Sequence, residues 1–138
     1  MFVLDRLAHN LHPTEGIKAI LDSGADIICD RYYYSTLAYQ GHSTDYEWVR
    51  RMNLDCPAIR KPDLCIYLDL TPEQSLERIV AGRQTVEIYE NREILERVRN
   101  AFFRVFDDLA GSDRIAVVNA YRPVEQIAAE LSSLVDSL

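Results

Sequence analysis

The sequence predicts an α/β fold in which a parallel β-sheet is covered by helices on both faces. Three short apolar runs have the length of strands, at residues 25–29, 64–68 and 115–118. Each run is almost continuously apolar, as in strands that are buried on both faces of a sheet. Stretches with helical periodicity alternate with these runs, which favours parallel strands joined by helices. Three strands are few for such a sheet, because about five or six are typical.

The stretch before the first predicted strand is expected to form two helical segments. Apolar residues recur at helical spacing from residue 2 to about residue 21, and Pro13 interrupts them. Ser23 and Gly24 then end the helix. Beyond the strand, we expect helices at residues 35–40 and 46–54, a loop at 41–44 and an irregular stretch at 57–62.

A well-marked helix start follows the second predicted strand. Thr71 can cap the helix, Pro72 suits its first turn, and the Gln74 amide can reach back as in a capping box. This helix is expected to run to about residue 80, before a loop at 81–86. A long amphipathic helix then covers residues 90–109, and a last helix covers residues 124–138 after the third strand. The inward face of the long helix is expected to carry Leu95, Val98, Phe102, Val105, Phe106 and Leu109.

Length and composition indicate one soluble globular domain. The chain has 138 residues, of which 48% are hydrophobic and 27% charged. Its net charge of -7 argues against a nucleic-acid surface, which needs basic patches, but leaves room for a nucleotide site with a few local cations. We expect no membrane span and no signal peptide. The three cysteines lack metal-ligand spacing and fit a reduced, cytoplasmic compartment, with Cys29 and Cys65 buried in strands.

The residues that follow the first predicted strand carry the most chemistry. The strand ends in Asp30 and Arg31, at the edge of the sheet where ligands bind in open α/β folds. An Asp at this place can hold magnesium, usually through water, in phosphate-transfer enzymes. The planar fork of an arginine matches the geometry of a phosphate. Both residues also have ordinary, non-functional explanations. Asp30 could be a turn residue or a helix cap, and Asp30 and Arg31 could form a surface ion pair, which contributes little stability.

Two further groups of residues suit a nucleotide base. Ser35, Tyr39 and Gln40 offer a hydroxyl, an aromatic face and an amide, and an amide matches the donor and acceptor edge of a base. A polar helix start with a half-buried Tyr39 would have the same sequence. Phe2 and Arg6 are four residues apart and share a helix face, so they could clamp a base. An aromatic core residue beside a surface arginine is the ordinary alternative.

The remaining cations are weaker candidates. Arg83 and Arg92 lie in a polar stretch at about residues 81–92, which could close over phosphates as a lid or could be a solvated face. Arg78, near the end of its helix, could stack on a base or simply favour the helix C-terminus. The three histidines show no ligand spacing and receive no role.

Taken together, these motifs resemble the thymidylate kinase family over nearly the whole chain. Residues 2–6 resemble the family's F-x-x-(D/N)-R helix, and residues 30–41 resemble its DRY…S…AYQ segment. Residues 61–73 resemble its PDL-x-(I/L)-YLD-x-xPE strand and helix start. Residues 87–90 resemble the E-R-Y-E at the end of its lid, with Ile88 in place of the arginine. The order and spacing of the motifs make the resemblance specific.

The resemblance implies a transferase that moves the γ-phosphoryl group of ATP onto dTMP with Mg²⁺, giving dTDP for nucleotide biosynthesis. The family typically works as a homodimer. By the same resemblance, Phe2 would stack on thymine, and Arg6 would bind near the base and the phosphate. Asp30 would lie near the magnesium and the sugar, and Arg31 would hold the acceptor phosphate. The other residues of the dTMP pocket would be Ser35, Tyr39, Gln40 and, from the lid side, Tyr89.

The resemblance also implies an ATP side and a lid. Arg78 and the turn from Asn119 to Arg122 would lie near the adenine. The lid loses one cation through Ile88, and Arg83 or Arg92 could substitute for it.

The chain departs from the family in its first part. The family begins with a strand and a P-loop, but no G-x-x-x-x-G-K-(S/T) motif occurs in the 138 residues. The three predicted strands match the third, fourth and fifth of a sheet ordered 2-3-1-4-5, so the central P-loop strand would be missing. The chain could be a fragment or a gene read from an internal methionine, a remnant that binds a nucleotide without catalysis, or one part of a two-chain enzyme.

We favour the first explanation: a single thymidylate-kinase-like domain over residues 1–138, truncated at its N-terminus, with a P-loop nucleotide kinase fold. We expect little or no kinase activity from the isolated polypeptide. The alternatives are a kinase for another nucleoside monophosphate and a non-catalytic binding or interaction module.

Overall fold

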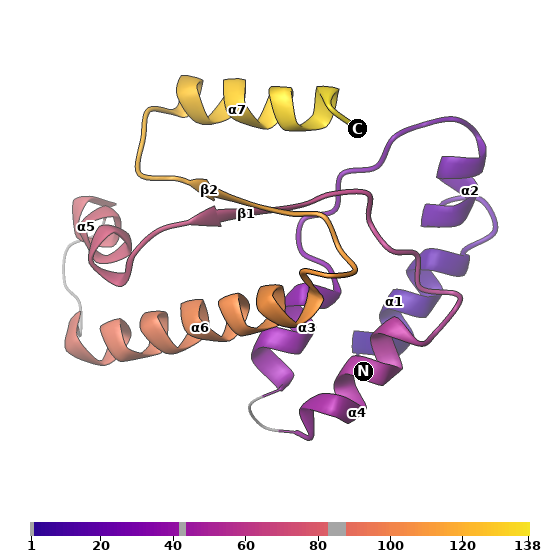
Figure 1. Ribbon diagram of the computed structural model, residues 1–138, viewed down its shortest axis with the longest axis horizontal. Coiled ribbons are helices and arrows are strands. Elements are labelled where there is room, and N and C mark those ends of the chain that lie inside the picture. The colour runs from indigo at the N-terminus through magenta and orange to yellow at the C-terminus, as the bar shows by residue number, and fades with distance from the viewer. Residues whose placement is uncertain (1, 42–43, 83–87) are drawn as a thin grey trace. The chain divides into compact units, whose positions relative to one another are not determined.

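The computed structural model describes residues 2–41, 44–82 and 88–138, with the side chains of residues 2, 80–82 and 88–91 outside the description. The chain divides into two compact units, Met1–Lys61 and Pro62–Leu138, each with its own internal contacts (Figure 1). The prediction of a single domain stays a prediction. Within the described residues, no helix is long and apolar enough to cross a membrane.

The first unit consists of helices. These are α1 (Phe2–Leu11), α2 (Ile17–Asp22), α3 (Tyr33–Gln40) and α4 (Tyr46–Leu54). The break at Pro13 is confirmed, and so is the stop at Gly24, whose φ of +83° lies in the left-handed region that glycine adopts freely. Helix α4 has the predicted bounds, and the Asp45 side chain caps it by accepting a hydrogen bond of 3.0 Å from the Trp48 N–H. Helix α3 begins two residues earlier than predicted.

The first predicted strand is not formed. Residues 25–29 have no regular secondary structure, and the Ile28 side chain is 99% exposed. Strand pairing in the described part of the chain involves β1 (Cys65–Asp69) and β2 (Ile115–Asn119) alone. An apolar run becomes a strand only where a neighbouring strand takes up its backbone hydrogen bonds. The predictions of a strand here and of a buried Cys29 are therefore wrong, and this thiol is exposed.

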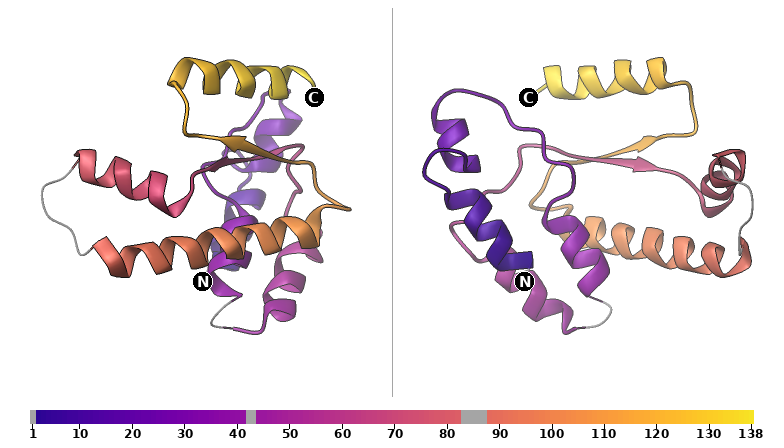
Figure 2. Two further views of the ribbon diagram at one scale, coloured as in Figure 1. Left: turned by 60° about the vertical axis from the view of Figure 1, so that its left-hand side comes forward. Right: turned by 180° about the vertical axis from the view of Figure 1, so that it is seen from behind.

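The second unit is a small α/β layer structure. Strands β1 and β2 pair in parallel, with Cys65 opposite Ile115 and Asp69 opposite Asn119. Helix α6 (Ile88–Leu109) lies on one face of the pair and α7 (Val124–Asp136) on the other (Figures 1 and 2). The prediction of a parallel sheet covered on both faces is confirmed for these two strands, while the expected third strand is absent from the described pairing.

The helix that follows β1 starts as the sequence predicts. The Thr71 N–H donates to Gln74 Oε1 at 2.9 Å, and the Gln74 N–H donates to Thr71 Oγ1 at 3.3 Å, which confirms the capping box. Helix α5 (Pro72–Gly82) runs two residues beyond its predicted end, so the start of the predicted loop is wrong. The rest of that loop lies outside the described residues.

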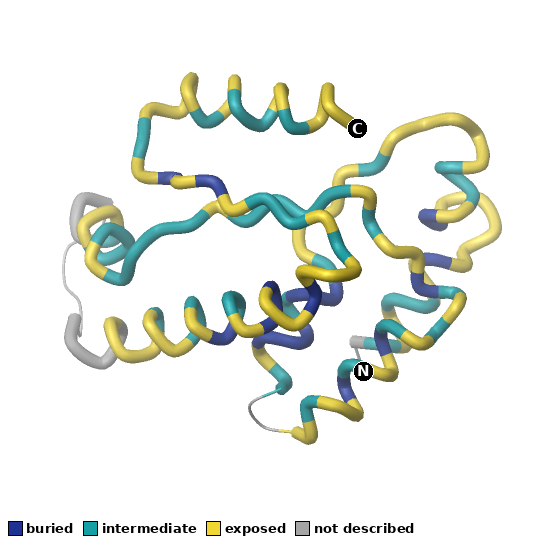
Figure 3. The backbone as a smooth tube through the Cα atoms, in the orientation of Figure 1, coloured by how far each residue is buried: buried dark blue, intermediate teal, exposed yellow. Residues whose placement is uncertain are grey.

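The core of the second unit forms between β1 and α6. The Tyr67 ring packs against Phe102 and Phe106, with centroids 5.1 Å away in both cases. Val105 and Leu109 follow on the same helix face and are almost fully buried. All six residues predicted to face inward on α6 are half-buried or buried, as the burial pattern in Figure 3 illustrates. The apolar period of the sequence therefore identifies the packed face of this helix correctly.

Candidate functional site

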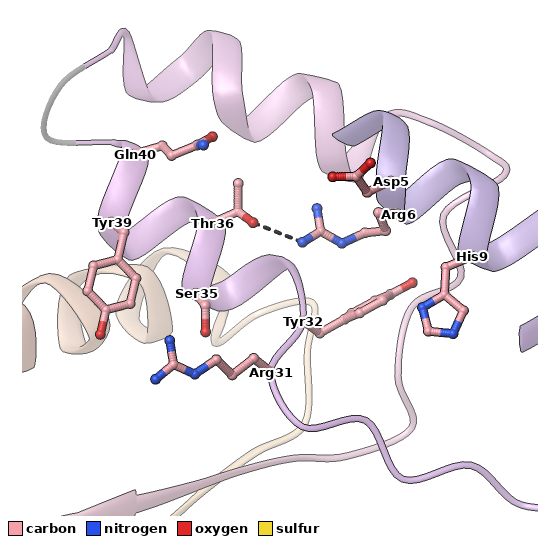
Figure 4. Close-up of a pocket in the computed structure, with 9 residues that line it drawn as sticks. All are labelled: Asp5, Arg6, His9, Arg31, Tyr32, Ser35, Thr36, Tyr39 and Gln40. Carbon is pink, nitrogen blue, oxygen red and sulfur yellow. Dashed lines mark hydrogen bonds between the residues drawn. The ribbon is translucent and has the colours of Figure 1, made fainter. Parts of the chain in front are cut away.

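A pocket of about 460 Å³ opens in the unit Met1–Lys61 (Figure 4). Its volume lies in the range of small-molecule sites. It is lined by Asp5, Arg6, His9, Arg31, Tyr32, Ser35, Thr36, Tyr39 and Gln40. The structure thus brings together five residues that the sequence singled out: Arg6, Arg31, Ser35, Tyr39 and Gln40.

Helical spacing explains which side chains reach the pocket. Helix α1 supplies Asp5, Arg6 and His9, and His9 lies four residues from Asp5 and three from Arg6, which places it beside both on the helix surface. Helix α3 supplies its lining residues at the same spacing, from Ser35 to Gln40. The segment that leads into α3 supplies the rest of the wall (Figure 4). The pocket is therefore built by two helix faces and one helix entry.

Arg6 is held by hydrogen bonds to two other helices. Its Nη2 donates to Thr36 Oγ1 of α3 at 2.8 Å, and its Nη1 donates to Asn53 Oδ1 of α4. Its guanidinium carbon lies 5.2 Å from the centre of the Tyr32 ring, which is a cation–π contact. Burial lowers the pKa of this guanidinium from its usual value, because the charged form loses solvation. Arg6 is thus a fixed, half-buried cation in the pocket wall.

A buried amide ties α1 to the entry of α3. Asn10 is 1% exposed, and its Nδ2 donates to the Arg6 carbonyl oxygen at 2.9 Å and to the Tyr32 hydroxyl oxygen at 3.1 Å. Its Oδ1 accepts from the Tyr32 hydroxyl at 3.2 Å and from the Arg60 N–H at 3.0 Å. Burial raises the pKa of the Tyr32 phenol. The neutral Tyr32 ring is therefore held in place as one side of the pocket.

Arg31 occupies an unusual backbone conformation at the pocket rim. Its φ of +68° makes it the one described non-glycine residue with positive φ. Its guanidinium carbon lies 5.9 Å from the centre of the Tyr39 ring, and the residue is exposed. Strained backbone of this kind tends to occur at functional sites.

Asp30, the residue before Arg31, is exposed and is not part of the pocket lining. The described side chains form no cluster of three or more His, Cys, Asp or Glu residues that could hold a metal ion by itself. A single carboxylate still suits Mg²⁺, which is often bound by one or two carboxylates together with substrate phosphates and water.

The predicted ATP-side residues meet at the carboxyl end of β2, within the second unit. Arg78 Nη2 donates to the Ala120 carbonyl oxygen at 2.6 Å. Asn119 Oδ1 accepts from the Tyr121 N–H at 2.8 Å, and Arg122 Nε donates to the Asn119 carbonyl oxygen at 3.0 Å. Arg122 also forms an ion pair with a glutamate of α7. The structure brings these three residues together, and their role toward a nucleotide stays a prediction.

The predicted lid residues are only partly described. Arg83 lies outside the described residues. Phe2 and Tyr89 lie in α1 and α6, but their side chains are outside the description. Arg92 forms an ion pair of 2.7 Å with Glu73, and both side chains are more than half exposed. Such a pair contributes little stability in solvent, so it leaves Arg92 able to exchange partners.

Sequence reasoning missed residues in both units. Tyr32, Thr36, Asp5 and His9 also line the pocket. His9 lies three residues from Arg6 on the same helix, and this spacing could have identified it. In the second unit, Arg99 makes two hydrogen bonds of 2.7 Å to the Asp69 carboxylate. No local spacing in the sequence relates these two residues, which are 30 positions apart.

The chain is similar in sequence to known proteins along most of its length. The model of the thymidylate kinase family matches residues 1–131. A probable thymidylate kinase of Archaeoglobus fulgidus is 34% identical over 138 residues, which cover 99% of this chain and 65% of that protein. The thymidylate kinase of Bacillus cereus strain ATCC 10987 is 34% identical, with 94% of this chain and 64% of that protein covered. A probable thymidylate kinase of Pyrococcus horikoshii is 32% identical over 136 residues, with 98% and 62% covered. The chain therefore spans less than two thirds of the length of these relatives.

Proposed function

Because this chain belongs to the thymidylate kinase family, we propose that its pocket binds dTMP as the acceptor of the γ-phosphoryl group of ATP. The observation that carries this proposal is the composition of the pocket wall. Two arginines, two tyrosine rings and a side-chain amide are among the groups that line one space of about 460 Å³. A nucleoside monophosphate presents an anionic phosphate and a flat base with donor and acceptor edges, and this set of side chains suits both.

Each residue that the sequence singled out for the dTMP pocket has a part in this proposal. Arg31, at the rim of the pocket, binds the acceptor phosphate through its planar fork. Arg6 binds near the base and the phosphate, and Gln40 and Ser35 offer hydrogen bonds to the base or the sugar. The Tyr39 ring supplies an aromatic wall. Phe2 stacks on the thymine, and Tyr89 approaches the sugar from the lid side.

In the proposed reaction, an oxygen of the dTMP phosphate forms a bond to the γ-phosphorus while the bond from that phosphorus to the β-phosphate oxygen breaks. Arg31, Arg83 and Arg92 stabilise the charge on the phosphates, and Arg78, Asn119 and Arg122 bind the adenine side of ATP. Bound Mg²⁺ would neutralise phosphate charge, and Asp30 is the carboxylate that would hold it. The fold type that goes with this activity is the P-loop nucleotide kinase fold, and we propose a cytoplasmic homodimer as its setting.

Two alternatives remain open to test. The pocket could take another nucleoside monophosphate, because Arg6 and Gln40 match more than one base edge. The chain could also bind a nucleotide without transferring phosphate, because its 138 residues contain no G-x-x-x-x-G-K-(S/T) loop. We expect dTMP binding with little ATP turnover from this polypeptide alone.

Calorimetric titration of the 138-residue chain with dTMP, UMP and CMP tests the proposal. We expect dTMP to bind most tightly and Arg31→Ala to weaken it by roughly 10- to 100-fold, as for the loss of a hydrogen bond to a charged group. Tighter binding of UMP or CMP would contradict the assignment to dTMP. An assay of ADP release in the presence of ATP, Mg²⁺ and dTMP separates catalysis from binding, and rapid turnover that Arg31→Ala abolishes would refute the expectation of an inactive polypeptide.

A further inference from the structure

The partners of Arg6 are unusual for a half-buried cation, because both are neutral. Asn53 is 1% exposed, and its Nδ2 donates to the Val49 carbonyl oxygen at 2.7 Å. That bond settles which way the amide faces, and it leaves Oδ1 directed at the Arg6 guanidinium. The second partner is the hydroxyl of Thr36, which is 7% exposed.

Among the residues that the structure describes, no carboxylate forms an ion pair with Arg6. Asp5, its neighbour on α1, nevertheless lines the same pocket. Desolvation lowers the pKa of this guanidinium, as expected for a buried cation without a counter-charge. A carboxylate in place of the Asn53 amide would still accept a hydrogen bond from the guanidinium, but it would also neutralise the charge and would lose the bond to the Val49 carbonyl oxygen.

We propose that Asn53 is a positioning residue for ligand recognition, which aims the Arg6 guanidinium at the pocket through a neutral acceptor and so leaves its charge available to an oxygen of the ligand. The inference rests on the proposed function, because it takes the ligand to be dTMP. Asn53 itself is not part of the pocket lining and acts through Arg6.

The test replaces the amide by a carboxylate of the same shape. Asn53→Asp is compared with the wild type and with Asn100→Asp, which makes the same chemical change at an exposed position of α6. Each variant is titrated with dTMP and with thymidine. We expect Asn53→Asp to weaken dTMP binding by about 10-fold or more, the loss typical of a hydrogen bond to a charged group. Asn100→Asp should leave the dissociation constant within about twofold of the wild type.

A second pair of variants separates positioning from a general structural role. In an Arg6→Met background, Asn53→Asp should change the dissociation constant of dTMP by less than about twofold, because the group through which Asn53 acts is gone. If Asn53→Asp weakens dTMP binding by the same factor in the wild-type and in the Arg6→Met background, the proposal is overturned. It is also overturned if Asn53→Asp binds dTMP with the affinity of the wild type. An equal loss of thymidine and dTMP binding would support contact of Arg6 with the base, and loss with dTMP alone would support contact with the phosphate.

The urea unfolding midpoints of Arg6→Met, Asn53→Ala and the double variant test the contact without any ligand. If Asn53 holds Arg6, the effects of Arg6→Met and Asn53→Ala on the unfolding equilibrium will not be additive, and Asn53→Ala adds no new charge beside Arg6. Additive effects would overturn the proposal. If the wild type binds neither dTMP nor thymidine, the proposed function fails while this unfolding cycle still decides whether Asn53 positions Arg6.

Discussion

The backbone of Arg31 allows its two roles, as a strained residue and as a phosphate ligand, to be separated by two substitutions. Its φ of +68° is easy for glycine and unfavourable for every residue with a Cβ. Arg31→Ala removes the guanidinium and keeps the strain, whereas Arg31→Gly removes both. The two variants should therefore bind dTMP equally poorly but differ in stability.

The expected difference in stability follows from the conformation. A left-handed backbone costs a non-glycine residue about 1–2 kcal/mol, which Arg31→Gly recovers and Arg31→Ala does not. Glycine also raises the conformational entropy of the unfolded chain, which offsets about 0.4–1 kcal/mol of that gain. Both variants lose the contact of the guanidinium with the Tyr39 ring, so that loss cancels in the comparison. Arg31→Gly should be more stable than Arg31→Ala by about 0.5–1 kcal/mol.

Urea unfolding followed by circular dichroism measures this difference. With a slope of about 1–3 kcal/mol per molar urea, the midpoint of Arg31→Gly should exceed that of Arg31→Ala by roughly 0.2–1 M. Calorimetric titration with dTMP on the same samples measures the other role. Both variants should lose affinity by the same factor, since neither retains a side chain that reaches the phosphate.

Two results would refute this reasoning. If Arg31→Ala is as stable as Arg31→Gly or more so, the positive φ stores no strain in the folded state. If either variant binds dTMP as the wild type does, Arg31 is not the phosphate ligand, whatever the unfolding data show.

Two other perturbations test the second unit. Burial raises the pKa of the Cys65 thiol to about 11, and the nearby Asp113 is a smaller cause of the same shift. In the unfolded chain this thiol titrates near 9.0, so the folded chain holds the proton more tightly. The stabilisation should be complete below pH 9 and be lost as the pH rises to 11. Because this thiol is partly exposed, solvent screening reduces the stabilisation to about 1–2 kcal/mol. Urea midpoints across this range should fall less in Cys65→Ala, and equal slopes would contradict the assignment. Thr71→Ala removes one half of the capping box of α5 and should cost about 1 kcal/mol in urea unfolding. An unchanged midpoint would show that this cap does not contribute.

The helices were largely predictable because their signals are local. The start of α5 follows from the capping residue Thr71, whose partner lies three positions away. The cap that the structure shows for α4, at Asp45, also has its partner three positions away. The inward face of α6 follows in the same way from its apolar period. Residues 25–29 show the limit of this reasoning, because an apolar run does not contain the strand that would pair with it.

The same division applies to the site. By itself, the sequence determined the family, through motifs such as residues 30–41, and it singled out five of the residues that line the pocket. Only the tertiary structure decided how Arg6 is held, because Thr36 and Asn53 lie 30 and 47 positions away from it. It also decided that Arg31 adopts positive φ and that Arg99 pairs with Asp69. Hydrogen bonds of helices and caps join near neighbours, whereas the charge and orientation of a pocket depend on which distant side chains packing brings into contact.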